Sequence, residues 1–192
     1  MKCKLLILTL LSISLNTFGQ NLDTTRNYVK TGINYAFFGS GDVSGTALYA
    51  EYTHYINKYF GITPKVNFGN AYRKNTDFYE VEINQVTIKS VSLSANYKPM
   101  PLRFSNLSFG FGGLISVFDN TYIFKTFSAP ENISVQSYSE IQFGLLGSLK
   151  LDVIEEERFN IGLNAELLTT FYGKYLEATS YQYGAYFAFK IQ

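Results

Sequence analysis

Seven charged residues share one property: each lies in a stretch where polar and apolar side chains alternate, on the polar side. They are Lys30, Glu51, Lys65, Glu140, Lys150, Glu166 and Lys190. Successive side chains of a strand point to opposite faces, so these charges would lie on the face away from the apolar residues. Charges removed from water are costly unless they are paired. We therefore expect a structural network of ion pairs inside the fold; the alternative interpretation is a gated path for ions.

The spacing of these charges suggests which of them meet. A tight turn at residues 56–59 would place Glu51 directly opposite Lys65 on the next strand. Cross-strand neighbours of opposite charge stabilise one another. The same counting places Glu166 in the layer next to Lys150 and Lys190. The network is therefore expected to cross several strands.

His54 is the only histidine, and a catalytic interpretation would depend on it. It lies just before the turn at residues 56–59, and the alternation points its side chain toward the apolar side. That position is typical of a residue at a membrane interface. No metal-ligand cluster, phosphate-binding loop or nucleophile motif stands out elsewhere. We therefore predict no catalytic residue, no cofactor site and no metal site.

Two longer polar segments carry aromatic residues that could bind a partner. These residues are Tyr72, Phe78, Tyr79, Tyr122, Phe124 and Phe127. The segments, 71–84 and 119–136, are predicted as loops, the first with strand extensions as an alternative. Strands that continue beyond a membrane would carry aromatics too, so binding is one of two interpretations.

Eight segments with period-two alternation must position these residues. They cover residues 28–38, 46–55, 61–69, 85–97, 107–118, 137–152, 160–171 and 179–192. Pro64 lies inside the third segment and removes one hydrogen bond between strands. It predicts either a bulge at that point or the loss of a pairing partner.

The composition indicates which face of these strands is covered by lipid. The chain has 16 Tyr and 17 Phe, and only 16% of its residues are charged, well below the quarter that is usual in soluble domains. The face opposite the apolar residues is mostly Gly, Ser, Asn and Ala, which suits a crowded interior. Short turns alternate with longer connections, as in membrane barrels. Aromatic residues recur near the strand ends, at Tyr35, Phe37, Tyr52, Tyr97, Phe171 and Phe189.

These features predict an all-β fold, a closed eight-stranded antiparallel up-and-down transmembrane β-barrel covering residues 20–192. Strands in lipid must close, because an open edge leaves backbone groups without partners. A barrel of this size has an interior that its own side chains fill, so we expect a plugged polar lumen.

The N-terminal residues 1–19 have the layout of a cleaved signal peptide: Lys2 and Lys4, an apolar run, then small and polar residues. The single cysteine, Cys3, lies in this segment. Basic and acidic residues nearly balance in the remainder, which gives no support for nucleic-acid binding.

The last strand carries the most specific motif, a polar residue, a glycine and two aromatics at Gln182, Gly184, Phe187 and Phe189. With this motif the chain resembles the small eight-stranded outer-membrane barrels of Gram-negative bacteria, of the OmpA and OmpX type. The resemblance implies a monomer in the cell outer membrane, in contact with outer-membrane lipid and lipopolysaccharide and inserted by the barrel assembly machinery. It implies a non-enzymatic role in envelope integrity or in surface binding and adhesion, with an extracellular ligand unknown. The alternatives are a narrow channel for small solutes and a lipid-modifying enzyme.

Overall fold

The computed structural model describes residues 27–38, 43–57, 59–74, 81–99, 106–125, 133–171 and 179–191. These ranges contain eight strands: β1 (Asn27–Phe38), β2 (Val43–Tyr55), β3 (Phe60–Lys74), β4 (Val81–Tyr97), β5 (Leu107–Lys125), β6 (Ile133–Glu155), β7 (Phe159–Thr170) and β8 (Ser180–Ile191). In the described ranges there is no helix of the length and apolar character that spanning a membrane requires.

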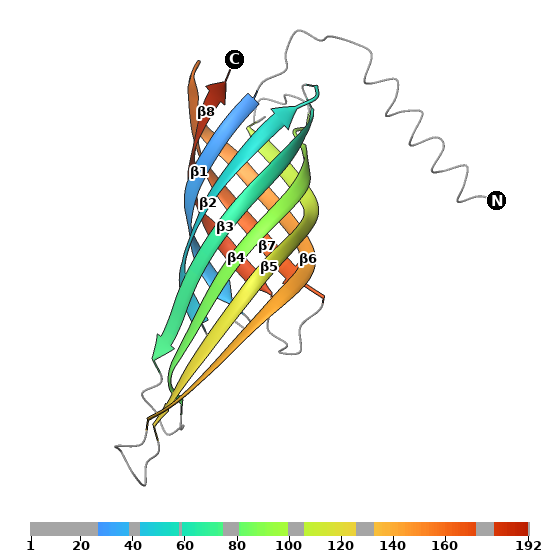
Figure 1. Cartoon of the computed structure of the whole chain (residues 1–192). Coiled ribbons are helices and arrows are strands. Elements are labelled where there is room, and N and C mark those ends of the chain that lie inside the picture. Colours follow the sequence, from blue (N-terminus) through green and yellow to red (C-terminus); the bar gives the residue numbers. More distant parts are fainter. Residues whose placement is uncertain are drawn as a thin grey trace, which may run out of the picture.

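The eight strands form a closed barrel in which each strand pairs with its neighbours in sequence (Figure 1). Every pairing is antiparallel, and β1 closes the barrel against β8, with Ile33 opposite Ala185. The predicted all-β, eight-stranded up-and-down barrel is therefore confirmed. We call the end with the connections β2–β3, β4–β5 and β6–β7 the turn end, and the opposite end the projecting end.

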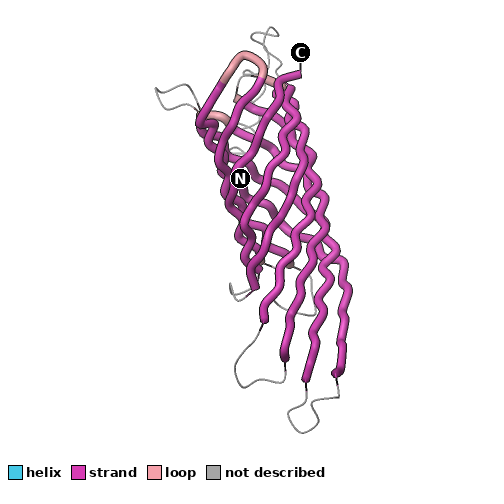
Figure 2. The backbone as a smooth tube through the Cα atoms, turned by 90° about the vertical axis from the view of Figure 1, so that its left-hand side faces the viewer, coloured by secondary structure: helices cyan, strands magenta, loops and turns pink. Residues whose placement is uncertain are grey.

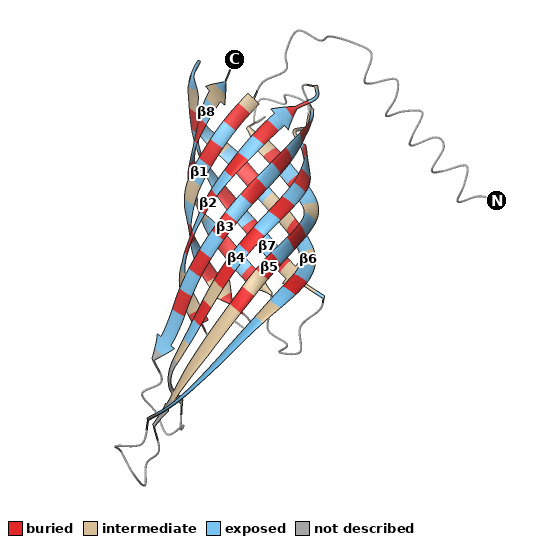
Figure 3. Cartoon of the chain, in the orientation of Figure 1, coloured by how far each residue is buried: buried red, intermediate tan, exposed pale blue. Residues whose placement is uncertain are grey.

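The strands alternate between exposed and buried residues around the whole barrel (Figure 3). The outward side chains are large and apolar; Val91, Phe111 and Ile141 are each more than 60% exposed. The inward side chains include Gln142 and Gln182, which are at most 2% exposed. A barrel with an apolar outside and polar groups inside matches the transmembrane class, since a soluble barrel has the opposite arrangement.

Aromatic side chains form contacts near both ends of the apolar outer surface. Phe60 lies 5.0 Å from Tyr97 at the turn end, measured between ring centroids. Tyr35 and Tyr183 lie 5.8 Å apart toward the projecting end. Such girdles are typical of transmembrane barrels, in which amphipathic rings lie at the level of the lipid headgroups.

Pro64 interrupts the pairing of β3 with β2 and leaves the register intact. Glu51 pairs with Lys65 and His54 with Ile62, whereas the two positions between them are unpaired. On its other side Pro64 pairs with Leu93 of β4. Of the two predicted outcomes, the lost pairing is the one observed, because proline cannot donate a hydrogen bond to the neighbouring strand.

The long strands correct the predicted loops. Most of the segment 119–136 is strand, since β5 runs to Lys125 and β6 begins at Ile133. β3 and β4 likewise extend to Lys74 and from Val81, in line with the alternative of strand extensions. Beyond the lipid-facing band the outward side chains need not be apolar, so the alternation fades while the hydrogen bonding continues. β2 also begins at Val43, three residues before its predicted start.

These extensions form a sheet that stands beyond the rest of the barrel (Figure 2). We call it the projecting sheet and define it as residues 71–74, 81–87, 119–125 and 133–139. β5 has 19 residues and β6 has 23, whereas about 9–11 residues suffice for a tilted strand to cross the membrane. On the side toward β7, pairing with β6 begins at Gly144, so residues 133–142 form one edge of the sheet in the described part of the chain.

Candidate functional site

Five of the seven predicted interior charges meet inside the barrel. Lys150 donates to both carboxylate oxygens of Glu51, at 2.6 Å for Oε2, and Lys30 lies 3.8 Å from Glu51. Lys65 forms an ion pair with Glu166 across the lumen. All five residues are at most 6% exposed. Glu51 lies opposite Lys65 in register, as predicted. Its ion pairs, however, are with Lys150 of β6 and Lys30 of β1, and Lys65 pairs with Glu166 of β7.

The two remaining predicted charges lie at opposite ends of the barrel. Lys190 lies at the turn end, 3.6 Å from Glu155, and donates to the backbone oxygen of Glu156 at 2.6 Å. Glu140 is half-buried toward the projecting end, next to Phe118 on the neighbouring strand. The structure therefore brings together a compact group of five charges rather than one network of seven.

Apolar and aromatic layers lie above and below this group. Toward the turn end lie Tyr28, Tyr55 and Ala188, whereas Tyr186 and Tyr49 of the same cluster lie beside Lys30 and Lys65. Toward the projecting end lie Ala36, Phe38, Val43, Ala47, Ala71, Val86, Ile88 and Phe118, together with the group Leu114, Leu146 and Leu168. The sequence places Ala36, Tyr49, Tyr186 and Ala188 on the polar face but does not predict these layers, because each apolar side chain there is isolated among polar ones. The lumen is therefore filled by alternating apolar and polar layers.

The tyrosine layer is connected to the charges. The Tyr186 hydroxyl donates to Asp152 at 2.5 Å. The Lys65 ammonium lies 3.9 Å from the centre of the Tyr49 ring, which is a cation–π distance. The aromatic layer therefore contributes partners to the interior charges as well as filling space.

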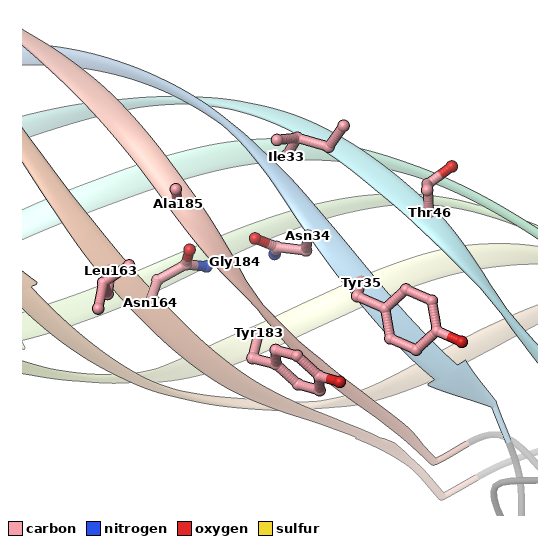
Figure 4. Close-up of a pocket in the computed structure, with 9 residues that line it drawn as sticks. All are labelled: Ile33, Asn34, Tyr35, Thr46, Leu163, Asn164, Tyr183, Gly184 and Ala185. Carbon is pink, nitrogen blue, oxygen red and sulfur yellow. The ribbon is translucent and has the colours of Figure 1, made fainter.

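The predicted motif of the last strand lies at the barrel seam, where β8 pairs with β1. Its Gly184 is labelled in Figure 4. Gln182 is buried and accepts from the Asn34 amide at 3.3 Å, whereas Phe187 and Phe189 are half-exposed on the outside. A Cβ at Gly184 would lie 2.0 Å from the backbone oxygen of Ile33, so this position requires glycine. Recognition of the motif by assembly machinery stays a prediction.

A shallow hollow lies on the outer surface at the same seam. It forms where the short side chain of Ala185 lies between Ile33 and Leu163, with Tyr35 and Tyr183 at one end (Figure 4). Its outward lining is mostly apolar, as on the rest of the barrel exterior. It is therefore continuous with the lipid-facing surface.

The candidate loop aromatics separate into two faces. Tyr72 points outward and is 71% exposed. Tyr122 lies on the opposite, inner face, where its ring meets that of Tyr138, a residue that sequence reasoning missed. Phe124 belongs to β5, and its side chain is outside the described part of the structure. Phe78, Tyr79 and Phe127 lie outside the described residues.

A polar band covers the outer face where the projecting sheet begins. Its residues are Asn70, Gln85, Lys89, Asp119, Thr121, Ser137 and Ser139. Ser139 donates to Asp119 at 2.6 Å, and Lys89 lies 3.3 Å from the same carboxylate. The hydrogen bond from Ser139, together with Lys89, holds the pKa of Asp119 below its ordinary value. This band contrasts with the apolar Val91, Ile115 and Ile141 nearer the barrel and marks the limit of the lipid-facing surface.

His54 lies at the turn end with an exposed side chain. Its Nδ1 is 2.7 Å from the Asn27 side-chain oxygen. The part of the chain that the structure describes contains no group of three His, Cys, Asp or Glu residues placed to hold a metal ion. The environment of His54 is therefore that of an exposed polar contact between β1 and β2.

Comparison with solved structures places this architecture among known barrels. No protein-family model and no curated protein matches the chain. A major outer membrane protein from Thermus thermophilus matches with a TM-score of 0.57 and 13% identity over 86% of this chain and 99% of its own. Ail, the attachment invasion locus protein of Yersinia pestis, matches with a TM-score of 0.51 and 13% identity over 87% of this chain and 99% of its own. The chain therefore has the fold of the small eight-stranded outer-membrane β-barrels.

Proposed function

We propose that the chain is an integral outer-membrane protein that binds a partner outside the cell through its projecting sheet, without enzymatic activity. One observation carries this proposal: β4, β5 and β6 continue as a hydrogen-bonded sheet well beyond the lipid-facing band. Crossing the membrane does not require this extra length, so it provides surface for another purpose. Three of the four connections at the end of the sheet have six or more residues, whereas two of the three at the turn end have four or fewer. Longer connections face the exterior in outer-membrane barrels.

The edge of β6 supports a binding role. Residues 133–142 pair with β5 on one side only in the described part of the chain. Unpaired edges of strands readily accept a partner, and proteins usually cover or blunt them. The crystal structure of Ail in complex with sucrose octasulfate, a heparin analogue, is an example of a barrel of this fold with a bound ligand.

The filled lumen favours a binding protein over a channel. The ion pairs around Glu51 pack against the tyrosine cluster, with the apolar layer on their projecting-end side, and Lys150 and Lys65 are each held by a carboxylate. An ion crossing this interior would have to displace buried, paired charges, which is costly. The non-enzymatic role is the simpler proposal, since His54 lies at the end of the barrel away from the projecting sheet.

The proposal includes the route to the membrane. Residues 1–19, outside the described part of the chain, act as a cleaved signal peptide, and the motif from Gln182 to Phe189 is read by the barrel assembly machinery. The mature protein is a monomer whose outward face contacts outer-membrane lipid, including lipopolysaccharide.

Shortening the sheet tests the binding role. Asn120 and Tyr138 are partners in register, so an Asn-Gly turn can replace residues 121–137 and close a two-residue hairpin. Bacteria displaying equal amounts of the full and the shortened chain are then compared for adhesion to a cultured epithelial monolayer. We expect the full chain to raise adhesion above that of bacteria lacking the protein, and the shortened chain to lose the increase. Equal adhesion by both chains, or no increase with either, would overturn the proposal.

A further inference from the structure

The inner face of the projecting sheet carries amide and aromatic side chains in two rows that cross β4, β5 and β6. The row farther from the barrel contains Asn84, Tyr122 and Gln136, and the nearer row contains Val86, Asn120 and Tyr138. Cross-strand partners in an antiparallel sheet point to the same side, so these six residues form one continuous surface. This surface adjoins the outermost apolar layer of the lumen, through Val86.

Two tyrosines of this surface are held in position by amides. The ring centroids of Tyr122 and Tyr138 are 6.3 Å apart, with the planes at 71°. The Asn120 amide donates to the Tyr122 hydroxyl at 2.8 Å, and the Tyr138 hydroxyl donates to the Gln136 oxygen at 2.9 Å. The aromatic rings therefore offer an ordered apolar surface next to polar atoms.

Several buried amide atoms of this region have no hydrogen-bond partner among the residues that the structure describes. They are Oδ1 of Asn84, Oδ1 of Asn120 and, at the level of the barrel mouth, Nε2 of Gln142. Gln142 is only 1% exposed, and its oxygen already accepts from Thr170 at 3.2 Å. Buried polar groups in folded proteins are nearly always hydrogen-bonded. The inner face thus contains two acceptors and a donor whose hydrogen-bonding capacity is not used by the described part of the chain.

The outer face of the same sheet provides a direct contrast. There Ser139 and Lys89 both contact Asp119, and Thr121 and Ser137 lie 3.2 Å apart. These polar groups have partners within the sheet. The buried unpartnered amide atoms of the described sheet, those of Asn84 and Asn120, therefore lie on the inner face.

The charges on the inner face indicate that a ligand bound there is uncharged. The six residues of the two rows are uncharged, and the charged residues beside them, Arg73 and Glu140, are of opposite sign. Arg73 is the only cation among the inner-face residues of the projecting sheet whose side chains are described. A sulfated or phosphorylated ligand would require several cations at one place.

We propose that the inner face of the projecting sheet binds an uncharged saccharide. Sugar hydroxyls both donate and accept hydrogen bonds, which matches amides such as Asn84 and Asn120. The apolar faces of a sugar ring pack against aromatic rings, as Tyr122 and Tyr138 provide. This inference rests on the proposed binding role and names its ligand class.

An array of uncharged and sulfated oligosaccharides tests the ligand class. The probe is the full chain, refolded and held in a lipid nanodisc. We expect binding to uncharged oligosaccharides and a loss of roughly tenfold in affinity for Asn120→Ala, which removes hydrogen-bonding groups from the site. Thr121→Ala, one residue away on the outer face, is the matched control and should bind like the unmodified chain.

Three outcomes would overturn the saccharide inference: no binding to any uncharged oligosaccharide, binding only to sulfated ones, or equal losses for Asn120→Ala and Thr121→Ala. A parallel adhesion assay shows whether only the saccharide inference is wrong or whether the binding role of the projecting sheet is wrong as well. If enzymatic removal of glycans from the monolayer leaves adhesion intact while the shortened chain still loses it, the sheet binds another class of partner, such as an extended peptide at the β6 edge. If the shortened chain adheres fully, the proposed function falls as well.

Discussion

Within the barrel, β5 and β6 have neighbours on both sides, and side chains such as Gln142 and Lys150 are almost completely buried. A few residues away on the same strands, β6 has a neighbour on one side only in the described part of the chain, and Tyr138 is 37% exposed. The same hydrogen-bonding ladder continues through both regions. What changes is the surroundings of the side chains: lipid and a filled lumen in the barrel, water on the projecting sheet.

Because of this difference, residues of the barrel determine folding stability, whereas residues of the projecting sheet can serve binding. Interior charges of the barrel are placed so that Glu51 and Glu166 each face lysines, because an unpaired charge there would be costly. On the projecting sheet the surface groups contribute less to folding, so their identities are free to serve recognition. Substitutions should therefore affect folding strongly in the barrel and weakly on the sheet.

The largest effect should come from removing the central carboxylate of the lumen. Glu51→Gln leaves Lys30 and Lys150 buried beside a neutral amide. We expect the free energy of unfolding to fall by about 3–5 kcal/mol, the usual cost of breaking a buried ion pair. Urea titration of the protein refolded in lipid bilayers measures this change. A loss smaller than that caused by Asp119→Asn on the projecting sheet would contradict the comparison.

A charge on the outer surface should have the next largest effect. Val91→Arg places a guanidinium on the lipid-facing side of β4, at a cost of up to about 2–4 kcal/mol in the middle of the bilayer. Gln85→Arg, on the same face of β4 but within the polar band, should cost about 0–1 kcal/mol. Equilibrium unfolding in bilayers compares the two variants. If Val91→Arg and Gln85→Arg lowered the free energy of unfolding equally, the lipid-facing surface would extend into the polar band.

A methyl group at the seam should have a smaller effect. The Cβ of Gly184→Ala would lie 2.0 Å from the Ile33 backbone oxygen and 2.5 Å from the Asn34 side-chain oxygen, whereas a Cβ at Gly147 meets nothing within 4 Å. We expect Gly184→Ala to destabilise the barrel by about 1–3 kcal/mol through overpacking. Gly147→Ala should stay within about 0.5 kcal/mol.

Refolding the purified protein without assembly machinery distinguishes a packing role of Gly184 from a role in recognition by that machinery. The folded fraction is read from the heat-dependent shift in gel migration. A normal folded fraction for purified Gly184→Ala, together with poor insertion in cells, would assign the glycine to recognition rather than to packing.

The smallest effect is expected on the projecting sheet. Asp119→Asn removes the charge that Lys89 and Ser139 contact, and exposed pairs of this kind contribute about 0–1 kcal/mol. Because the pKa of Asp119 is lowered in the folded state, its contribution is present above the ordinary pKa of an aspartate and is lost as the pH falls through the folded value. The free energy of unfolding of the unmodified chain should therefore fall slightly more between neutral and strongly acidic pH than that of Asp119→Asn. Unfolding curves at the two pH values measure this difference.

The alternation of side chains was enough to predict the barrel, because period two is imposed by strand geometry and any shift in register would put charges such as Lys150 into lipid. It also placed Glu51 opposite Lys65. It could not predict the actual ion pairs, since Lys150 and Glu166 reach their partners across the lumen from strands far apart in sequence. Distances across a closed barrel do not follow from the local pattern.

The projecting sheet was harder to predict for a related reason. The pattern that identifies a lipid-facing strand disappears beyond the membrane, so the sequence predicts a loop where residues 119–125 and 133–136 form strands. The partners Asn120 and Tyr138, and Tyr122 and Gln136, show that the pairing continues there. The alternation does not identify Phe38, Ile88 and Leu146 as interior residues, because a single apolar side chain on a polar face has no periodic signal of its own.

Hydrogen exchange resolved by residue, on the full chain in nanodiscs, tests the division between the two regions most directly. Backbone amides of β6 inside the barrel, from Gly144 to Leu151, have partner strands on both sides and should exchange slowly. Amides of residues 134–142 on the edge side should exchange orders of magnitude faster and become protected when a partner binds. Uniform slow exchange along β6 without a partner would contradict the account, because it would mean that the projecting sheet has no open edge.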